Sequence, residues 1–116
     1  MCLIVSNDFV INGNKVWKIL FKNGVGLFSE IFHYAWKPGW NVTDLQPETL
    51  EKIVNYGFHV HLQRPEPIFS SDAIVEFTFE KSDLIAVGYH SETGERQAVF
   101  KRLHLSEEEY NRAKNS

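Results

Sequence analysis

The feature that most constrains the fold is the strict alternation of apolar and polar side chains in residues 74–80 (IVEFTFE). Val75 and Phe77 fall on one face of an extended chain, whereas Glu76 and Thr78 fall on the other. A period of two residues is typical of a strand that buries one face, and a helix would need a period of 3.6. The sequence therefore predicts a sheet with one face packed on a core.

A second alternating segment, residues 16–22 (VWKILFK), is followed by Asn23-Gly24, the strongest two-residue signal for a hairpin. Residues 26–32 are the natural return strand. The sequence predicts six strands, or seven when the short N-terminal segment is included. They cover residues 2–5, 16–22, 26–32, 58–63, 74–80, 85–89 and 96–105.

Two short helices complete the expected elements. Pro47 suits the first turn of a helix and Gly57 suits its end, which predicts a helix over residues 47–56. Ser106 and Glu109 form a capping box at the start of a polar C-terminal helix that we expect to fray. We expect one domain over residues 1–116, in the α+β class, with a mainly antiparallel β-sheet.

The charge of the chain narrows the classes of partner. The chain has twelve Lys and Arg residues and fifteen Asp and Glu residues, which give a formal net charge of −3, and the basic residues are scattered along the sequence. We therefore expect no nucleic-acid partner. The single cysteine excludes a disulfide within the chain, and no apolar run approaches the roughly 20 residues that span a bilayer. The N-terminal residues lack the features of a signal peptide, so we expect a cytoplasmic protein without a membrane partner.

The chain concentrates aromatic residues around one turn. Pro38-Gly39 suits a type II turn, because proline fixes φ and glycine supplies a positive φ. Trp36 and Trp40 flank this turn, and Tyr34 precedes it. Exposed, these three residues would form the anchor of a protein interface, and they are the candidate partner-binding residues. Buried, they would pack the core, which we favour for Trp36, while both alternatives stay open for Trp40.

His59 and His61 share one face of the strand predicted over residues 58–63. In one interpretation this pair binds a ligand or supplies two ligands to a metal ion. The third ligand would then be His33, His90 or His104. In the interpretation that we favour, Phe58, Val60 and Leu62 face the core and the histidines face solvent or form local hydrogen bonds, so we expect no metal and no cofactor.

Cys2 is the remaining candidate nucleophile. If the initiator methionine were removed, Cys2 would be N-terminal and its own amine would act as the base, as in class II glutamine amidotransferases. Those enzymes have glycine after the cysteine, whereas Leu3 follows here. We therefore expect Cys2 to be a small buried apolar residue at the head of a strand. The sequence contains no other catalytic motif.

Several motifs together resemble a loose group of small uncharacterised phage and prophage proteins. They are the Met-Cys-Leu start, the Trp-x-Pro-Gly turn, the strand Gly57-Phe58-His59 and the segment AVFKR at residues 98–102. The resemblance covers most of the chain. It implies a small accessory protein of a phage or a mobile element and implies no particular activity.

The order of elements is also faintly similar to a minimal ADP-ribosyltransferase fold, in which a split sheet holds NAD. The similarity rests on a glycine-aromatic strand, a loop and a Val-x-Phe strand, which recur in that fold. This chain departs from that pattern, because no arginine or histidine is clearly placed for NAD and no catalytic glutamate can be assigned.

Because no catalytic site can be assembled, we expect an accessory protein that binds a host or phage protein and performs no catalysis. The alternative is an enzyme, ADP-ribosyltransferase-like or metal-dependent, with its site around His59 and His61. A third interpretation is an inert structural part of a larger complex. The sequence specifies neither the partner nor the oligomeric state.

Overall fold

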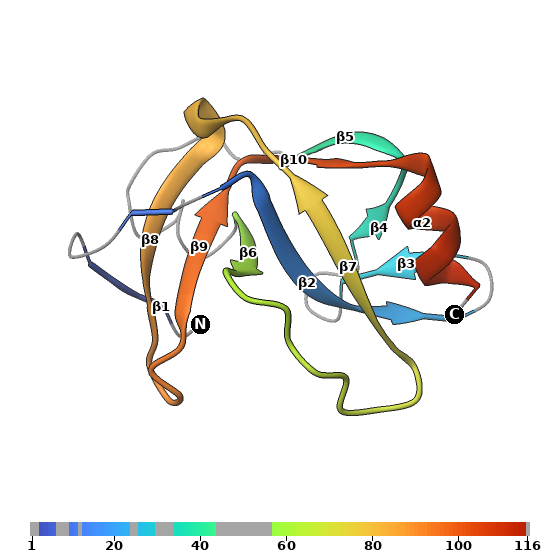
Figure 1. The fold of residues 1–116 in the computed structure, drawn as a ribbon, viewed down its shortest axis with the longest axis horizontal. Coiled ribbons are helices and arrows are strands. Elements are labelled where there is room, and N and C mark those ends of the chain that lie inside the picture. Colours follow the sequence, from blue (N-terminus) through green and yellow to red (C-terminus); the bar gives the residue numbers. More distant parts are fainter. Residues whose placement is uncertain are drawn as a thin grey trace.

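The computed structural model describes residues 3–6, 10–11, 13–23, 26–29, 34–43 and 57–115. Within these ranges the chain forms ten strands, one 3-10 turn and one α-helix (Figure 1). In chain order they are β1 (Leu3–Val5), β2 (Lys15–Lys22), β3 (Leu27–Phe28), β4 (Ala35–Trp36), β5 (Gly39–Val42), β6 (Phe58–His61), β7 (Asp72–Thr78), η1 (Lys81–Asp83), β8 (Leu84–His90), β9 (Arg96–Phe100), β10 (Arg102–Leu105) and α2 (Glu107–Lys114).

The strands form one strongly curled sheet in the order β1-β8-β9-β6-β2-β7-β10-β5, and every described pairing is antiparallel. β2 organises the sheet, because it pairs with β7 along its whole length on one edge. Its other edge pairs first with β6 and then with β3, which in turn pairs with β4. The predicted mainly antiparallel architecture is confirmed.

The alternation that predicted β7 also fixes its buried face. Val75 and Phe77 are buried, and across the β2–β7 pair they lie opposite Lys18 and Val16. Val16 and Leu20 are fully buried, so the core face of β2 carries Val16, Lys18 and Leu20. The more apolar-looking face of β2, which includes Trp17, is the outer face and is only half-buried.

The described residues form ten strands where the sequence predicted six or seven, and the strand bounds differ in detail. The strand predicted over residues 96–105 divides at Lys101, whose backbone N–H donates to the carbonyl of Asp83. β9 pairs with β6 and β8 before this point, and β10 pairs with β5 and β7 after it. The return strand after β2 is shorter than predicted, and the turn at Pro38-Gly39 joins two short strands, β4 and β5, that the sequence did not predict.

The C-terminal helix is confirmed as α2. The Ser106 hydroxyl accepts a hydrogen bond from the Glu109 backbone N–H at 3.1 Å, as the capping box predicted. Ala113 is buried in the core and α2 packs against β7 and β3, contacts that oppose the fraying predicted for this helix. The helix predicted over residues 47–56 lies outside the described residues, as does Cys2.

Side chains of α2 also complete the edge of β7. β10 pairs with β7 only at His104 and Thr78, and beyond this point α2 takes the place of a strand. The Glu109 carboxylate accepts the Glu76 backbone N–H at 2.8 Å, and the Arg112 guanidinium donates to the Ile74 carbonyl at 2.7 Å. The two side chains therefore satisfy backbone groups that a neighbouring strand would otherwise satisfy.

Candidate functional site

Trp40 is a partly exposed aromatic residue on the surface of the sheet. Its side chain lies on the outer face of β5 and is 38% exposed. His104 lies directly across on β10, and the two rings form an edge-to-face pair with centroids 5.0 Å apart. The guanidinium of Arg102 stacks on the indole, 3.9 Å from its centroid. The indole is thus held in place from two sides while part of it remains in contact with solvent.

The neighbours of Trp40 extend this surface. Arg102 is itself fixed by Asp83, whose carboxylate accepts its Nε–H at 2.9 Å and is almost fully buried. Val42 lies opposite Arg102 in the β5–β10 pair, and its side chain is exposed. We call Trp40, Val42, Arg102 and His104 the Trp40 face.

A fully buried amide positions the turn that leads to Trp40. The Asn41 side-chain oxygen accepts hydrogen bonds from the Lys37 backbone N–H and from the Tyr34 hydroxyl, at 3.1 and 3.0 Å. Its amide group donates to the carbonyls of Lys37 and Gly39, at 2.9 and 3.2 Å. Gly39 has a φ of +97°, the positive value that the Pro-Gly pair predicted. No pattern in the sequence pointed to Asn41.

Trp36 lies in the core, only 3% exposed, as we favoured from the sequence. Its ring packs against Phe58 and Phe77 at centroid distances of 4.5 and 4.8 Å, and its Nε1–H donates to the Ser29 hydroxyl at 2.8 Å. Tyr34 is half-buried and meets Trp36 edge to face. Of the three candidate partner-binding residues, Trp40 is therefore the one with an exposed ring in this structure.

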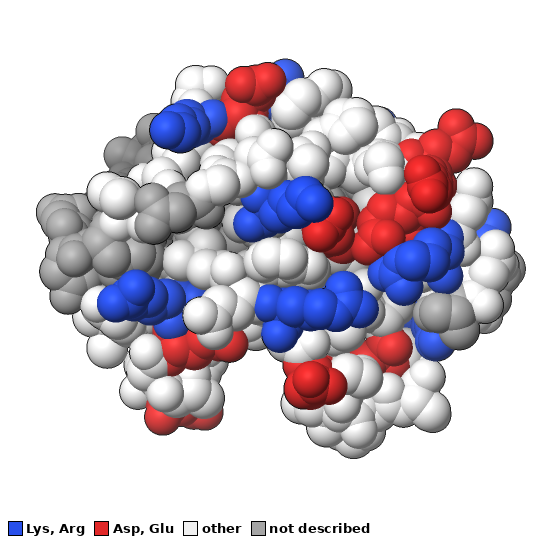
Figure 2. All heavy atoms as spheres, viewed as in Figure 1, with Lys and Arg blue, Asp and Glu red and all other residues white. Residues whose placement is uncertain are grey.

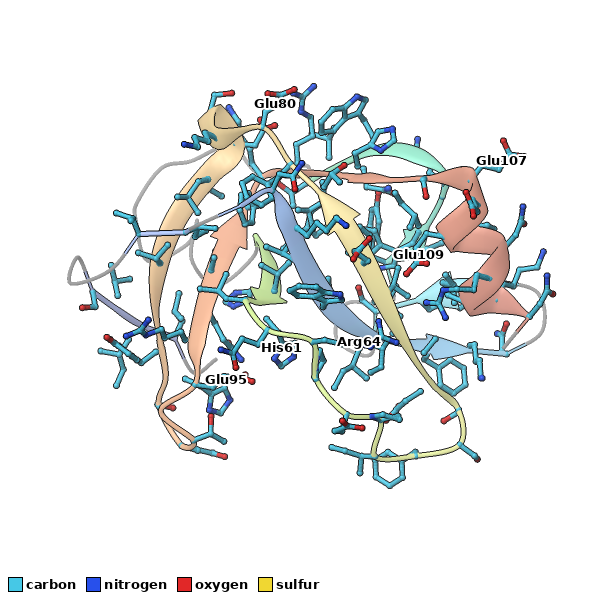
Figure 3. The ribbon with its side chains drawn as sticks, in the orientation of Figure 1. His61, Arg64, Glu80, Glu95, Glu107 and Glu109 are labelled. Atoms are coloured by element: carbon cyan, nitrogen blue, oxygen red, sulfur yellow. The ribbon has the colours of Figure 1, made fainter. Side chains whose placement is uncertain are left out.

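The inward orientation predicted for Phe58 and Val60 is confirmed. Phe58 and Val60 are buried, whereas His59 and His61 lie on the other face of β6 and are half-buried. His61 Nδ1 lies 2.7 Å from Glu95 Oε1, and Figure 3 shows the two side chains next to each other. Glu95 comes just before β9, 34 positions further along the chain, so no local pattern could have paired it with His61.

Glu95 is held as a carboxylate by its surroundings. Burial raises the pKa of this group and is the largest single effect, and the hydrogen bond from the Gln97 amide lowers the pKa. The charge of His61 and its hydrogen bond lower the pKa further, so that the net shift is downward. Both bonds end on the same oxygen, Oε1, with Gln97 Nε2 at 2.9 Å.

A cavity of about 440 Å³ adjoins this pair. It lies where β6 ends, because β6 pairs with β2 only at His61 and Trp17 before the chain leaves the sheet. Three kinds of side chain line it: apolar groups, two cations and polar or acidic groups. The lining residues are Val10, Ile11, Leu62, Lys15, Arg96, Gln63 and Glu95.

The other histidines have separate surroundings. His90 Nδ1 accepts the backbone N–H groups of Glu92 and Thr93 in the turn after β8, and His104 packs on Trp40. His33 lies outside the described residues. Across the described ranges, no three His, Cys, Asp or Glu side chains gather closely enough to hold a metal ion.

Lys18 is a second feature that the sequence did not reveal. Its side chain points to the core face of β2, where its ammonium donates to the His59 carbonyl at 2.5 Å and lies 6.0 Å from the Trp36 ring centroid. Burial lowers its pKa from 10.5 to about 8. A lysine in an alternating strand is ordinarily assigned to the solvent face, which is why the pattern concealed this position.

Comparisons of the chain with models of protein families, with curated proteins and with solved structures found no match. The resemblance to phage proteins and the similarity to ADP-ribosyltransferases therefore remain predictions from the sequence. In the part of the chain that the structure describes, no helix has both the length and the apolar character needed to cross a bilayer.

Proposed function

We propose that this chain is a small accessory protein, of phage or mobile-element type, that acts by binding a host or phage protein and performs no catalysis. One observation carries the proposal: the Trp40 indole is exposed on the sheet although Arg102 and His104 hold it in a fixed position. Tryptophan and arginine are enriched among the few residues that supply most of the binding energy of interfaces.

The Trp40 face has the composition expected of a contact surface. Its β5 side is apolar, with Trp40 and Val42, and its β10 side carries the polar groups of Arg102 and His104. Because the indole and the guanidinium are already ordered, a partner would lose little side-chain entropy on binding them. A protein with an apolar pocket beside hydrogen-bond acceptors fits this face.

Trp40→Ala is the test of this proposal. We expect the variant to bind the partner about 10- to 100-fold more weakly, the usual effect of removing a central tryptophan. Tagged wild-type protein, Trp40→Ala and the control Phe69→Ala are used to capture proteins from the cells that carry the gene. Phe69 is an aromatic residue that is 66% exposed outside the Trp40 face. The dissociation constant of the recovered partner is then measured by calorimetry.

Partner capture by the control Phe69→Ala and the melting temperatures of both variants show whether a loss of binding comes from the Trp40 side chain or from unfolding. A partner retained by Phe69→Ala but lost by Trp40→Ala supports the proposal, provided that both variants melt within a few degrees of wild type. Equal binding by Trp40→Ala and wild type contradicts it. If Trp40→Ala unfolds, the milder Trp40→His keeps a ring on Arg102, and unchanged partner affinity in that folded variant contradicts the proposal as well.

The alternative, an enzyme around His59 and His61, has one observation in its favour. A carboxylate that orients an imidazole beside a cavity is an arrangement used for general acid–base catalysis, and Glu95 and His61 have it. In the ADP-ribosyltransferase-like version, NAD raises the melting temperature. In the metal-dependent version, elemental analysis of the purified protein finds a stoichiometric metal. Absence of both results contradicts this alternative.

A further inference from the structure

We propose that the cavity at the end of β6 binds a small organic anion, a carboxylate or a phosphate monoester, through Lys15 and Arg96, with its apolar part on Ile11 and Leu62. The cavity combines two cations with an apolar wall. This inference does not depend on the partner proposed for the Trp40 face.

The position of the cavity follows from the topology. The pairing of β6 with β2 and with β9 ends at His61, and the residues that follow, Leu62 and Gln63, line the cavity together with Lys15 of β2 and Arg96 of β9. In Figure 2 the lower edge of the molecule is hollowed between two lobes. Figure 1 identifies these lobes as the turn between β8 and β9 and the segment between β6 and β7. Glu95 and Gln63, which line the cavity, belong to these two segments, whereas Val10, Ile11 and Lys15 belong to the chain before and at the start of β2, which Figure 1 places away from this lower edge.

The apolar wall is continuous with the core. Ile11 and Leu62 pack against the main hydrophobic cluster and are only partly buried. Val10, next to Ile11, is 76% exposed, an unusual position for a large apolar side chain at the border of a cavity. The apolar part of a ligand would remove these three side chains from water, at roughly 25 cal/mol for each Å² covered.

The two cations come from different strands. Lys15 begins β2 and Arg96 begins β9, so they approach the cavity from separate parts of the sheet. The ion pair of Lys15 with Glu76 spans 3.9 Å, and both side chains are largely exposed. Such a pair is weak and competes little with a bound anion. Among the described residues, the lining thus has the positive groups of Lys15 and Arg96 and the carboxylate of Glu95.

Glu95 favours anionic ligands that also carry a hydrogen-bond donor. Gln97 and His61 both bind its Oε1, which leaves Oε2 as the acceptor for a donor on the ligand. A hydroxyl or amine next to the anionic group would satisfy this oxygen. The volume of about 440 Å³ lies at the lower end of the roughly 300–1,000 Å³ range of small-molecule pockets. A ligand of metabolite size therefore fits.

Titration of ¹⁵N-labelled protein by NMR tests this inference. The probes are hexanoate and phenyl phosphate, with hexanol and phenol as neutral analogues of the same apolar parts. We expect at least one anion to cause saturable shifts of the amide signals of Ile11, Lys15, Leu62 and Arg96, and the neutral analogues to bind at least tenfold more weakly. The ratio of affinities for the two anions identifies the preferred head group.

Variants separate the cavity from general charge effects. Lys15→Gln combined with Arg96→Gln is expected to weaken anion binding at least tenfold. The control Lys81→Gln combined with Lys114→Gln makes the same change of charge at residues that do not line the cavity. Val10→Glu, at an exposed position, adds a carboxylate at the border and is expected to weaken binding without unfolding the protein. Equal binding of neutral analogues, equal loss in the control, or no saturable shift with any probe overturns the inference.

Discussion

Lys18 carries a positive charge on the core face of β2, beside the Trp36 ring, and burial lowers its pKa from 10.5 to about 8. Between these values the unfolded chain binds more protons than the folded protein. Stability therefore rises with pH through this window, by an amount on the order of 1–3 kcal/mol. Urea unfolding of the wild type between pH 7 and 11 measures the rise.

Lys18→Met is the matched control for this prediction, because methionine has a similar volume and does not titrate. Other lysines and the tyrosines titrate in the same range, so the informative quantity is the difference between the two proteins. We expect Lys18→Met to lack the part of the rise that belongs to Lys18. Parallel curves for the two proteins would show that the amine of Lys18 titrates alike in the folded and unfolded chains.

The orientation of single residues was predictable where alternation decides it. Phe58, Val60 and Val75 follow the period of a strand, and each faces the core as predicted. Contacts between residues far apart in the sequence were not predictable. Arg102 meets Asp83 across 19 positions and stacks on Trp40, and these contacts arise only once β10 lies next to β5.

The edge of β7 gives a prediction at the scale of an element. The Glu109 carboxylate joins the Glu76 backbone N–H to Arg112, whose nitrogens lie 2.6 and 2.9 Å from its oxygens. Glu109→Gln keeps a hydrogen-bond acceptor but loses its charge, so we expect a loss of about 1–2 kcal/mol at pH 7. Urea unfolding gives the loss, and hydrogen exchange of the Glu76 amide shows whether this edge opens.

The pH dependence of stability tests whether the negative charge of Glu109 causes the loss expected in Glu109→Gln. Burial raises the pKa of Glu109, but the hydrogen bonds from Arg112 and the Glu76 backbone outweigh it, so the pKa lies below the ordinary value of 4.5. The stabilisation is present above this ordinary value and is lost as the pH falls through the lowered pKa. The difference between wild type and Glu109→Gln should shrink on acidification. Glu108→Gln, an exposed change in the same helical turn, should show little difference at either pH.

The attachment of β1 depends on a glycine in β8. A Cβ atom on Gly88 would lie 2.1 Å from the carbonyl oxygen of Ile4, which is part of the backbone of β1. We therefore expect Gly88→Ala to separate β1 from β8 at a cost of about 1–3 kcal/mol. Hydrogen exchange should accelerate at Ser6, whose N–H donates to the Val87 carbonyl, while the β2–β7 amides stay protected.

A second glycine serves as the control for this change. A Cβ on Gly26 would make only ordinary contacts, the nearest at 3.5 Å. Gly26→Ala should leave the β1 amides protected. Protection of the Ser6 amide in Gly88→Ala would mean that the sheet accommodates the methyl group without releasing β1.

The elements differ in how far the sequence specified them. In long strands such as β2 and β7, the alternation of apolar and polar residues is enough to predict the strand from the sequence. β4 has only two residues and β5 has four, too few to show such a period. Segments this short are defined by their partners and not by a period. The division between β9 and β10 is likewise a tertiary effect, because the hydrogen bond of Lys101 to Asp83 redirects the chain.

For the whole molecule, the sequence predicted that the sheet is antiparallel but did not predict the order of its strands. Antiparallel pairing follows from successive alternating strands, and the composition supports a single core. The central pair, however, joins β2 to β7, and Lys15 pairs with Thr78 across more than half of the chain. The cavity depends on this order, because Lys15, Leu62 and Arg96 come together only when β6 lies between β2 and β9.

The arrangement of the sheet predicts that the two surfaces act independently. Trp40 on β5 is three strands away from Lys15 on β2, with β10 and β7 between them, roughly 14 Å at the usual spacing of strands. Changes this far apart that share no contacts usually have additive effects. We expect Trp40→Ala to leave the affinity for hexanoate or phenyl phosphate within twofold of wild type, as measured by the NMR titration. The cavity variant Lys15→Gln with Arg96→Gln should likewise leave partner affinity unchanged in calorimetry. A tenfold effect in either direction would mean that β7 and β10 transmit a change between the two surfaces, contrary to the additivity that their separation implies.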